Sequence, residues 1–275
     1  MLLERGASTV ICFDITPPDS VLQERFDVVQ KKTSASLLIL SGADGDITSA
    51  EAVNAAFEAA SQIDVVYHIA ALVGPFHDRS KYEAVNYYGT MYVLQACQKY
   101  NVPKLVYSSS PSTRFTGADI DGLREDQLPI PDKFLALYAE TKAQAEKQVA
   151  AACGKEGVLT ISVAPHQVYG PYDSLFFPKL METAGTGCLR IFGTGDNMIS
   201  VCFVDNYCHC SGANHDGRKA FASGEMDRHI SEYYKPSLLT ETQNGCTRIN
   251  RTSCLERVSL GFRFANNEAT RQETT

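Results

Sequence analysis

The chain has 275 residues, of which 44% are hydrophobic and 21% are charged, so it can bury one substantial α/β domain with a smaller lobe. Its formal net charge of −7 excludes the basic surface that nucleic-acid binding needs and favours small-molecule chemistry. Nine cysteines stand singly along the chain, which predicts free thiols in a reducing compartment. The apolar runs are too short for a membrane span, which needs about twenty residues, while peripheral membrane attachment stays open.

From its start the chain alternates short β-rich runs with longer helical patterns, which predicts a parallel sheet with helices on both faces. The predicted strands are 9–13, 37–40, 65–69, 104–107 and 159–163. The predicted helices are rich in Ala, Glu and Gln and cover 48–60, 82–100 and 134–152. We therefore expect a doubly wound, Rossmann-like α/β fold, in which ligands bind beyond the carboxyl ends of the strands.

The two ends of the chain depart from this pattern. Residues 1–6 have the pattern of the last turns of a helix that is capped by Gly6 and leads directly into a strand. We therefore expect the first strand of the sheet, with a glycine-rich turn, upstream of Met1. From Ser211 onward the apolar periodicity stops, which predicts a poorly ordered stretch. The expected organisation is an incomplete Rossmann-like domain over 1–165, a small substrate-side segment over 166–210 and a divergent tail over 211–275.

A tyrosine and a lysine form the candidate catalytic pair. Tyr138 and Lys142 stand four residues apart in a helix-forming context, so both side chains are expected on one helical face. An ammonium near a phenol favours the phenolate, which can accept a proton from an alcohol as hydride leaves its carbon. The spacing alone is weak evidence, because about half a match is expected by chance. Tyr100 and Lys104 repeat it, but Pro103 ends the helix between them. The alternative for the first pair is an exposed pair on a helix surface.

Polar residues follow two of the predicted strands, at the edge where ligands bind. Ser110 closes a serine cluster, 108–110, after the fourth predicted strand, where a hydroxyl can hold a substrate oxygen. Asp14 ends the first predicted strand, where a carboxylate can bond ribose hydroxyls and repel a 2′-phosphate. Each has an ordinary alternative, a strand-terminating serine and a turn aspartate before Pro17. Their order along one chain carries more weight than either residue alone.

The candidate metal ligands are Cys208, His209 and Cys210, with His215 nearby. Their spacing does not match the paired C-x-x-C ligands that are typical of tetrahedral zinc. We therefore expect no metal site.

An ordered set of motifs leads to a family. The set consists of Asp14, Gly45-Asp46-Ile47, His68-Ile69-Ala70-Ala71, Val85-Asn86-Tyr87-Tyr88-Gly89-Thr90, Ser108-Ser109-Ser110, Tyr138 to Lys142, Val168-Tyr169-Gly170-Pro171 and Phe203-Val204-Asp205-Asn206. It resembles the extended short-chain dehydrogenases/reductases from Met1 to Cys210. Within that superfamily, residues 115–129 resemble the 3β-hydroxysteroid dehydrogenase and sterol-4-carboxylate 3-dehydrogenase branch. Sugar-nucleotide epimerases usually differ in that stretch.

The resemblance implies an NAD-dependent oxidoreductase of steroid and sterol metabolism. It would oxidise the 3β-hydroxyl of a sterol or steroid, with decarboxylation where the substrate carries a 4-carboxylate. By the same resemblance, Ser110 orients the hydroxyl, Tyr138 is the base, and Lys142 activates Tyr138 and binds the nicotinamide ribose. Asn86 braces the helix that carries the pair.

The resemblance also implies the residues that bind the cofactor. Asp14 is assigned to the adenosine ribose, and Asp46 and Ile47 are assigned to the adenine. Ala70 and Ala71 are assigned to the backbone beside the cofactor. Because no arginine near Asp14 could receive a phosphate, NAD is expected in preference to NADP.

The chain departs from the family at three points. The glycine-rich turn that binds pyrophosphate would lie upstream of Met1. Ala164 stands where an arginine is frequent, and Pro111 directly follows the serine cluster, which leaves Ser109 as an alternative to Ser110.

Two rival functions stay open. One is a nucleotide-sugar epimerase, dehydratase or reductase that uses the same tyrosine and lysine, and the other is an inactive, truncated family member. We expect a small-molecule partner and no nucleic acid, and leave a homodimer open. The expected location is the cytoplasm or the surface of the endoplasmic reticulum.

Overall fold

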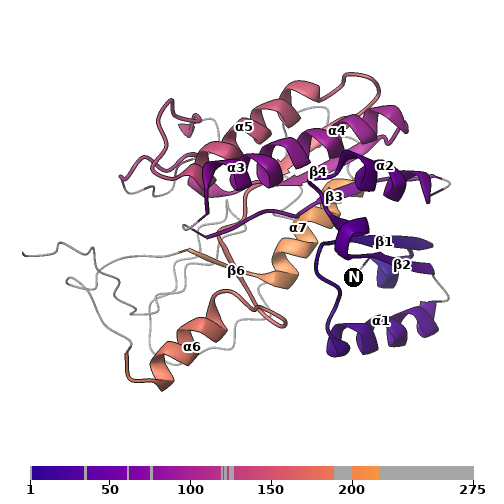
Figure 1. The fold of residues 1–275 in the computed structure, drawn as a ribbon, viewed down its shortest axis with the longest axis horizontal. Helices are drawn as coiled ribbons and strands as arrows, with labels where there is room; N and C mark the ends of the chain where they lie inside the picture. The colour runs from indigo at the N-terminus through magenta and orange to yellow at the C-terminus, as the bar shows by residue number, and fades with distance from the viewer. Residues whose placement is uncertain are drawn as a thin grey trace, which may run out of the picture. The chain divides into compact units, whose positions relative to one another are not determined.

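In the computed structural model, short parallel strands alternate with helices (Figure 1). The structure describes residues 2–33, 36–60, 62–74, 77–118, 120, 123, 127–188 and 200–216. These residues fall into two compact units. The first unit contains residues 2–164 and 208–216, and the second contains residues 165–207.

All strand pairs of the first unit are parallel, which confirms the predicted sheet type. The strands are β1 (Thr9–Phe13) paired with β2 (Ser36–Leu40), and β3 (Val66–His68), β4 (Lys104–Ser108) and β5 (Leu159–Val163), in which β4 is central. Leu105 of β4 lies opposite Val66 on one side and Thr160 on the other. Each strand differs from its predicted range by at most one residue at either end. Short apolar runs bounded by polar residues were therefore a sufficient signal.

Among the described residues, β1 and β3 are not paired with each other, so the first unit has two separate hydrogen-bond ladders. In the doubly wound order, the further strand expected upstream of Met1 would stand between them, and this strand remains a prediction. Leu3–Arg5 form a 3-10 turn that ends at Gly6, whose φ is 92° and whose N–H donates to the Leu3 carbonyl. The glycine-capped helix end is therefore present as predicted.

Helices connect the parallel strands, because a parallel pair needs a long crossover. They are α1 (Ser20–Thr33), α2 (Ala50–Glu58), α3 (Arg79–Tyr82), α4 (Gly89–Lys99) and α5 (Leu137–Ala152). A π-helical segment, Glu83–Tyr88, joins α3 and α4 end to end (Figure 1). The helix predicted over 82–100 is therefore part of one continuous helix, 79–99, with an internal π-helical turn. Interruptions of this kind are frequent at functional sites. The helix α1 was not predicted from the sequence. It contains no buried residue and therefore lacks a clear apolar stripe.

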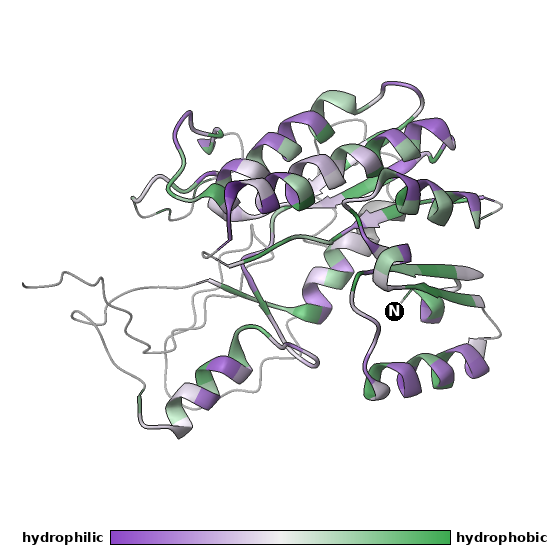
Figure 2. Cartoon of the chain, in the orientation of Figure 1, coloured by the Kyte–Doolittle hydropathy of each residue, from purple (hydrophilic) through white to green (hydrophobic). Residues whose placement is uncertain are grey.

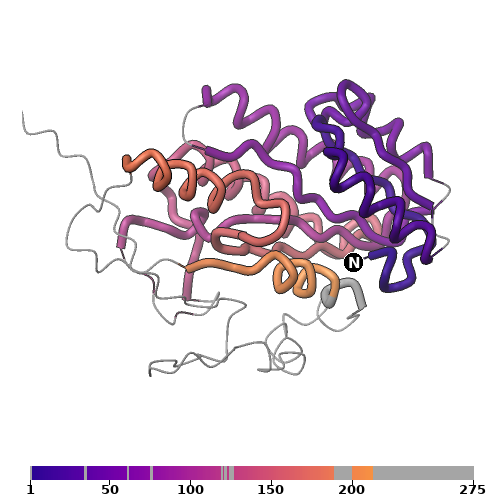
Figure 3. The backbone as a smooth tube through the Cα atoms, turned by 90° about the horizontal axis from the view of Figure 1, so that it is seen from below, coloured from indigo at the N-terminus to yellow at the C-terminus, as the bar shows by residue number. Residues whose placement is uncertain are grey.

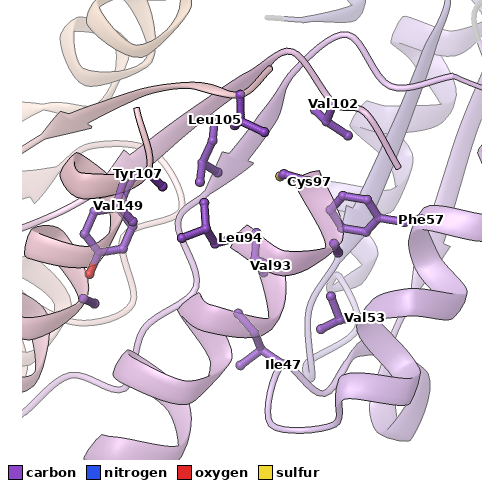
Figure 4. Close-up of a cluster of buried hydrophobic side chains, with 14 residues drawn as sticks. Ile47, Val53, Phe57, Val93, Leu94, Cys97, Val102, Leu105, Tyr107 and Val149 are labelled. Carbon is purple, nitrogen blue, oxygen red and sulfur yellow. The ribbon is translucent and has the colours of Figure 1, made fainter. Parts of the chain in front are cut away.

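The main core of the first unit is formed by side chains from α2, α4, β4 and α5 (Figure 4). Leu105 and Tyr107 of β4 and Cys97 of α4 have no exposed surface. Ala143 and Ala145 of α5 are equally buried, and their small side chains let this helix approach its neighbours closely. The Ala-rich composition of α5 is therefore a packing requirement as well as a helix signal.

The first part of the chain is less deeply packed. β1, α1, β2 and α2 lie together at one side of the first unit (Figures 1 and 3). β1 and β2 are mostly hydrophobic in Figure 2, yet neither strand contains a fully buried residue. Phe13 at the end of β1 packs against the main core. Within this layer α2 contributes buried side chains to the core, whereas β1, β2 and α1 join it through few.

The second unit contains a small parallel pair, β6 (Gln167–Tyr169) with β7 (Val201–Phe203), and the helix α6 (Phe177–Gly185). A further helix, α7, covers Val204–Asp216 and so continues past Ser211, where the sequence predicted a loss of regular structure. The remainder of the stretch predicted to be poorly ordered, 217–275, lies outside the described residues. No helix in the described part of the chain combines the length and the apolarity that a membrane span requires.

Candidate active site

The residues predicted to form the site all belong to the first unit, and most follow the carboxyl ends of its parallel strands. They are Asp14 after β1, Asp46 and Ile47 after β2, Ala70 and Ala71 after β3, and Ser110 after β4. The ends of parallel strands form the ligand-binding edge of doubly wound sheets. The remaining residues come from helices, Asn86 from the π-helical segment and Tyr138 and Lys142 from α5.

The structure brings Tyr138 and Ser110 together. Tyr138 stands in the first turn of α5, and the Ser110 side chain approaches its hydroxyl closely enough to lower its pKa as a hydrogen-bond partner. Its ring packs edge-on against the Tyr82 ring at 6.4 Å. Burial raises the pKa of Tyr138, and the bond to Ser110 works in the opposite direction. Two hydroxyls from separate elements therefore converge on one point.

Ser109 and Ser110 point to different partners, which separates their roles. The Ser109 hydroxyl donates to Oε2 of the buried Glu146 at 2.5 Å, and the residue is only 4% exposed. The Ser110 hydroxyl lies 2.9 Å from that of Ser112 and also reaches Tyr138. Of the two serines, Ser110 is thus the one that stands beside the tyrosine.

Lys142 is almost completely buried, with 2% of its surface exposed. Its ammonium donates to the Ser108 carbonyl at 2.5 Å and lies 4.3 Å from the centre of the Tyr107 ring. A carbonyl dipole and a ring face both stabilise a cation, but they do not replace its full hydration. Burial therefore lowers the pKa of Lys142 to about 7, against the opposing effect of the Glu146 charge.

A neutral histidine supports the ring on which Lys142 rests. Nε2 of His68 lies 2.8 Å from Oγ1 of Thr90, and the His68 ring packs at 5.4 Å from that of Tyr107. Burial lowers the pKa of His68 to about 3, and the charge of Lys142 adds to this effect. His68 is therefore uncharged at neutral pH and acts as a fixed polar support. In the sequence, His68 was part of a family motif but had no predicted function of its own.

Asn86 connects the chain after β3 to α5. Its side-chain carbonyl accepts from the Leu72 N–H at 2.8 Å, and its amide donates to the Leu72 carbonyl at 3.1 Å and to the Thr141 hydroxyl at 3.4 Å. Thr141 directly precedes Lys142, and Asn86 itself is 1% exposed. These bonds are those of a brace between two elements of the site.

Two acidic residues follow β1 and β2, Asp14 directly and Asp46 after a 3-10 turn over Gly42–Gly45. Asp14 is exposed and accepts from the Thr16 N–H at 2.8 Å, while Asp46 accepts from the N–H and hydroxyl of Thr48, both at 2.8 Å. A Cβ on Gly45 would stand 2.1 Å from the Asp14 carbonyl oxygen, so only glycine allows the two turns to touch. The strand-end turns are therefore held against each other.

The second tyrosine–lysine match has no shared helical face. Tyr100 caps the end of α4 and Lys104 begins β4, as Pro103 predicted. The Tyr100 hydroxyl instead donates to Glu58 at 2.6 Å. In the part of the chain that the structure describes, no group of three His, Cys, Asp or Glu side chains is arranged to hold a metal ion.

Comparison with known proteins assigns the chain to a family. A family model for 3-beta hydroxysteroid dehydrogenase/isomerase matches residues 1–211. The chain belongs to this family. Part of the stretch that carried the resemblance to its sterol branch, residues 119, 121–122 and 124–126, lies outside the described residues.

Curated relatives are identical to this chain at about a third of the aligned positions. A 2-alkyl-3-oxoalkanoate reductase from Stenotrophomonas maltophilia is 35% identical over 163 residues, 59% of this chain and 48% of the relative. A human sterol-4-alpha-carboxylate 3-dehydrogenase, decarboxylating, is 34% identical over 167 residues, 60% of this chain and 44% of the relative. The chain thus spans about half the length of these relatives, or less.

A solved structure confirms the predicted fold class. A UDP-glucuronic acid 4-epimerase from Bacillus cereus, in complex with UDP-glucuronic acid and NAD, matches with a TM-score of 0.61 at 23% identity. The match covers 79% of this chain and 69% of the epimerase. At this identity the likeness shows the Rossmann-like parallel α/β fold.

Proposed function

We propose that this chain forms the catalytic and NAD-binding part of an oxidoreductase that oxidises the 3β-hydroxyl of a sterol or steroid. The observation that carries the proposal is the approach of Ser110 to Tyr138, together with the burial of Lys142 one helical turn after Tyr138 on α5. Membership of the 3-beta hydroxysteroid dehydrogenase/isomerase family supports the same reaction class. Residues 166–210 are proposed to contribute to the substrate side.

The three side chains divide the work of moving one proton. Ser110 holds the substrate oxygen by a hydrogen bond and keeps it next to Tyr138. The Tyr138 phenolate accepts the proton of the alcohol. The Lys142 ammonium, one helical turn away, stabilises the negative charge of that phenolate. Bound NAD supplies the acceptor for the hydride.

The residues at the strand ends suit a dinucleotide. The exposed carboxylate of Asp14 can accept hydrogen bonds from ribose hydroxyls, and its negative charge disfavours a 2′-phosphate. Asp46 and Ile47 are proposed for the adenine, and Ala70 and Ala71 for the backbone beside the cofactor. The close contact between Gly45 and the Asp14 carbonyl holds the turn of Asp14 beside the turn of Asp46 and Ile47.

The names of the relatives narrow the substrate class. A sterol 4-carboxylate that reacts at C3 and a 2-alkyl-3-oxoalkanoate share one substructure. In both, the carbon next to the one that bears the carboxylate carries an oxygen function. Oxidation of such a 3-hydroxy acid gives a β-keto acid, which loses carbon dioxide readily. A 4-carboxysterol is therefore the proposed substrate. The second candidate is an acyclic 2-alkyl-3-hydroxy acid, favoured by the oxoalkanoate reductases among the relatives.

A substrate panel tests the proposal. The chain is incubated with NAD and, in turn, a 3β-hydroxysterol, a 4-carboxysterol, a 2-alkyl-3-hydroxy acid and a UDP-sugar. NADH absorbance is followed for the alcohols, and the UDP-sugar products are separated by chromatography, because an epimerase or dehydratase produces no net NADH. We expect the carboxysterol to react fastest. Turnover of the UDP-sugar alone would replace the proposal by a sugar-nucleotide activity. NAD binding by calorimetry without turnover of any compound would point to an inactive family member.

A further inference from the structure

A buried ion pair lies directly behind the catalytic pair. The guanidinium of Arg114 meets the carboxylate of Glu146 at two points, Nη1 to Oε2 and Nη2 to Oε1, both at 2.5 Å. Their side chains are 23% and 9% exposed. The same carboxylate also accepts from Ser109 at 2.5 Å and from Thr113 at 3.5 Å. Four donors from one short segment thus converge on Glu146.

These contacts join the two elements that must meet in the site. Arg114, Thr113 and Ser109 belong to the segment 109–114 after β4, here called the serine loop, which also carries Ser110. Glu146 belongs to α5, which carries Tyr138 and Lys142. A two-point bond between a guanidinium and a carboxylate has a fixed geometry. The pair therefore sets the distance between the serine loop and the helix.

An exposed ion pair on the same helix provides a contrast. Glu140 of α5 bonds Arg79 at 3.1 Å, with side chains that are 27% and 50% exposed. Solvent screens such a pair, and it contributes little. The charges of Glu146 and Arg114 are largely removed from water, so loss of one would leave the other poorly compensated. Of these two pairs on α5, the less exposed one is expected to act more strongly on its neighbours.

The neighbour that matters most is the Lys142 ammonium. Glu146 follows Lys142 by four residues, one helical turn on the same face of α5. In the described part of the chain the Lys142 ammonium contacts a carbonyl and a ring, and no carboxylate is within ion-pair distance of it. The titratable or charged groups around it are His68 from β3, Tyr107 from β4, Tyr138 and Glu146 from α5, and Arg114 from the serine loop.

Glu146 is the carboxylate of this set and forms the ion pair with Arg114. Burial lowers the pKa of His68 to about 3 and raises the pKa values of Tyr107 and Tyr138. Without Glu146, Arg114 would lose its carboxylate partner, and Lys142 would lose the negative charge that acts on it from the next helical turn. Burial of the Lys142 ammonium would then be opposed by less favourable electrostatics.

We propose that Glu146 is a positioning residue, which fixes the serine loop on α5 through Arg114 and acts by its charge on Lys142, one helical turn away on the same helix. This role rests on the proposed function of the Tyr138–Lys142 pair. The sequence contains a signal for it, since Glu146 continues the spacing of Tyr138 and Lys142 by one further turn.

The direct test is a pH titration of Lys142 by NMR in the full chain labelled with 13C at the lysine Cε. Exposed lysines titrate far above neutral pH, and Lys142→Met identifies the resonance by its loss. In Glu146→Gln, which keeps the shape of the side chain, we expect the midpoint of Lys142 to fall by roughly one pH unit. Glu140→Gln, with the same change on the exposed pair, should leave it in place.

Two further variants separate charge from geometry. Glu146→Asp keeps the charge, so it should restore most of the Lys142 midpoint. Arg114→Lys keeps the cation but loses the two-point bond, so amide hydrogen exchange in residues 109–114 should become faster. This second measurement decides the positioning role even if Glu146→Gln does not fold.

The proposal is overturned by an unchanged Lys142 midpoint in folded Glu146→Gln, or by unchanged exchange in Arg114→Lys. Neither measurement requires turnover. A chain that titrates as expected but oxidises no substrate would therefore refute the proposed function and leave the electrostatic role of Glu146 standing.

Discussion

The two sides of the first unit place their candidate site residues in opposite environments. On the side of β3, β4 and β5, Asn86, Thr141 and Lys142 are each at most 2% exposed, and Tyr107 has no exposed surface. On the side of β1 and β2, no residue of these strands or of α1 is fully buried, and Asp14 is exposed. Packing in the core thus fixes the residues on the side of β3, β4 and β5. Short turns and the close contact at Gly45 position those on the side of β1 and β2.

The difference follows from the chemistry that each side is proposed to perform. Proton transfer needs groups whose pKa values are shifted, and burial is what lowers the pKa of Lys142 to about 7. Recognition of ribose hydroxyls needs only a carboxylate in the right place, which an exposed turn can supply. We therefore expect substitutions on the two sides to fail in different ways, one in turnover and stability and the other in cofactor choice.

The largest expected effect is on turnover and concerns the buried side. Tyr138→Phe removes the proton acceptor but keeps the ring that packs against Tyr82, so turnover should fall roughly 10²- to 10⁴-fold while substrate binding largely survives. Steady-state kinetics and calorimetry measure the two quantities. Tyr100→Phe is the matched control, since it removes a hydroxyl that bonds the exposed Glu58. An equal loss in both variants would mean that the effect is structural.

Much of this arrangement can be predicted from the sequence, because it depends on local patterns. Apolar runs such as Leu159–Val163 predict the strands, and the polar residues that follow them mark the ligand-binding edge. The i, i+4 spacing predicts that Tyr138 and Lys142 share a face, and Pro103 excludes the second match. The family follows from the order of the motifs, and the matching family model confirms it.

What the sequence does not show are contacts between distant segments. Ser109 and Ser110 are adjacent and chemically identical, and only the approach of α5 shows that one bonds Glu146 and the other Tyr138. The link from Arg114 to Glu146 spans 32 positions. The helix α1 escapes prediction for another reason, because it has no buried face to produce a pattern. Local periodicity therefore finds elements and their edges, but not how side chains pair across the core.

The next effect concerns stability and compares one substitution on the two sides. Leu105 in central β4 has no exposed surface, whereas Leu38 in β2 is 38% exposed. Leu105→Ala leaves a cavity among well-packed neighbours and should lower the free energy of unfolding by about 2–5 kcal/mol. Leu38→Ala should lower it by about 1 kcal/mol or less. Urea denaturation measures both, and similar losses would show that the β1–β2 side is packed as firmly as the core.

The smallest expected effect is on cofactor choice and concerns Asp14. Its carboxylate is exposed and tied only to its own turn by the bond from Thr16, so Asp14→Asn should leave folding almost unchanged. Loss of the charge weakens the bond to a ribose hydroxyl and removes the repulsion of a 2′-phosphate. We therefore expect NAD affinity to fall by roughly tenfold and the preference for NAD over NADP to shrink. Glu24→Gln, which removes one charge from α1 in the same layer, should change neither. Calorimetric titration with both cofactors measures the ratio, and tighter binding of NADP than NAD by the unaltered chain would mean that Asp14 is a turn residue and that the β1 side recognises the cofactor in another way.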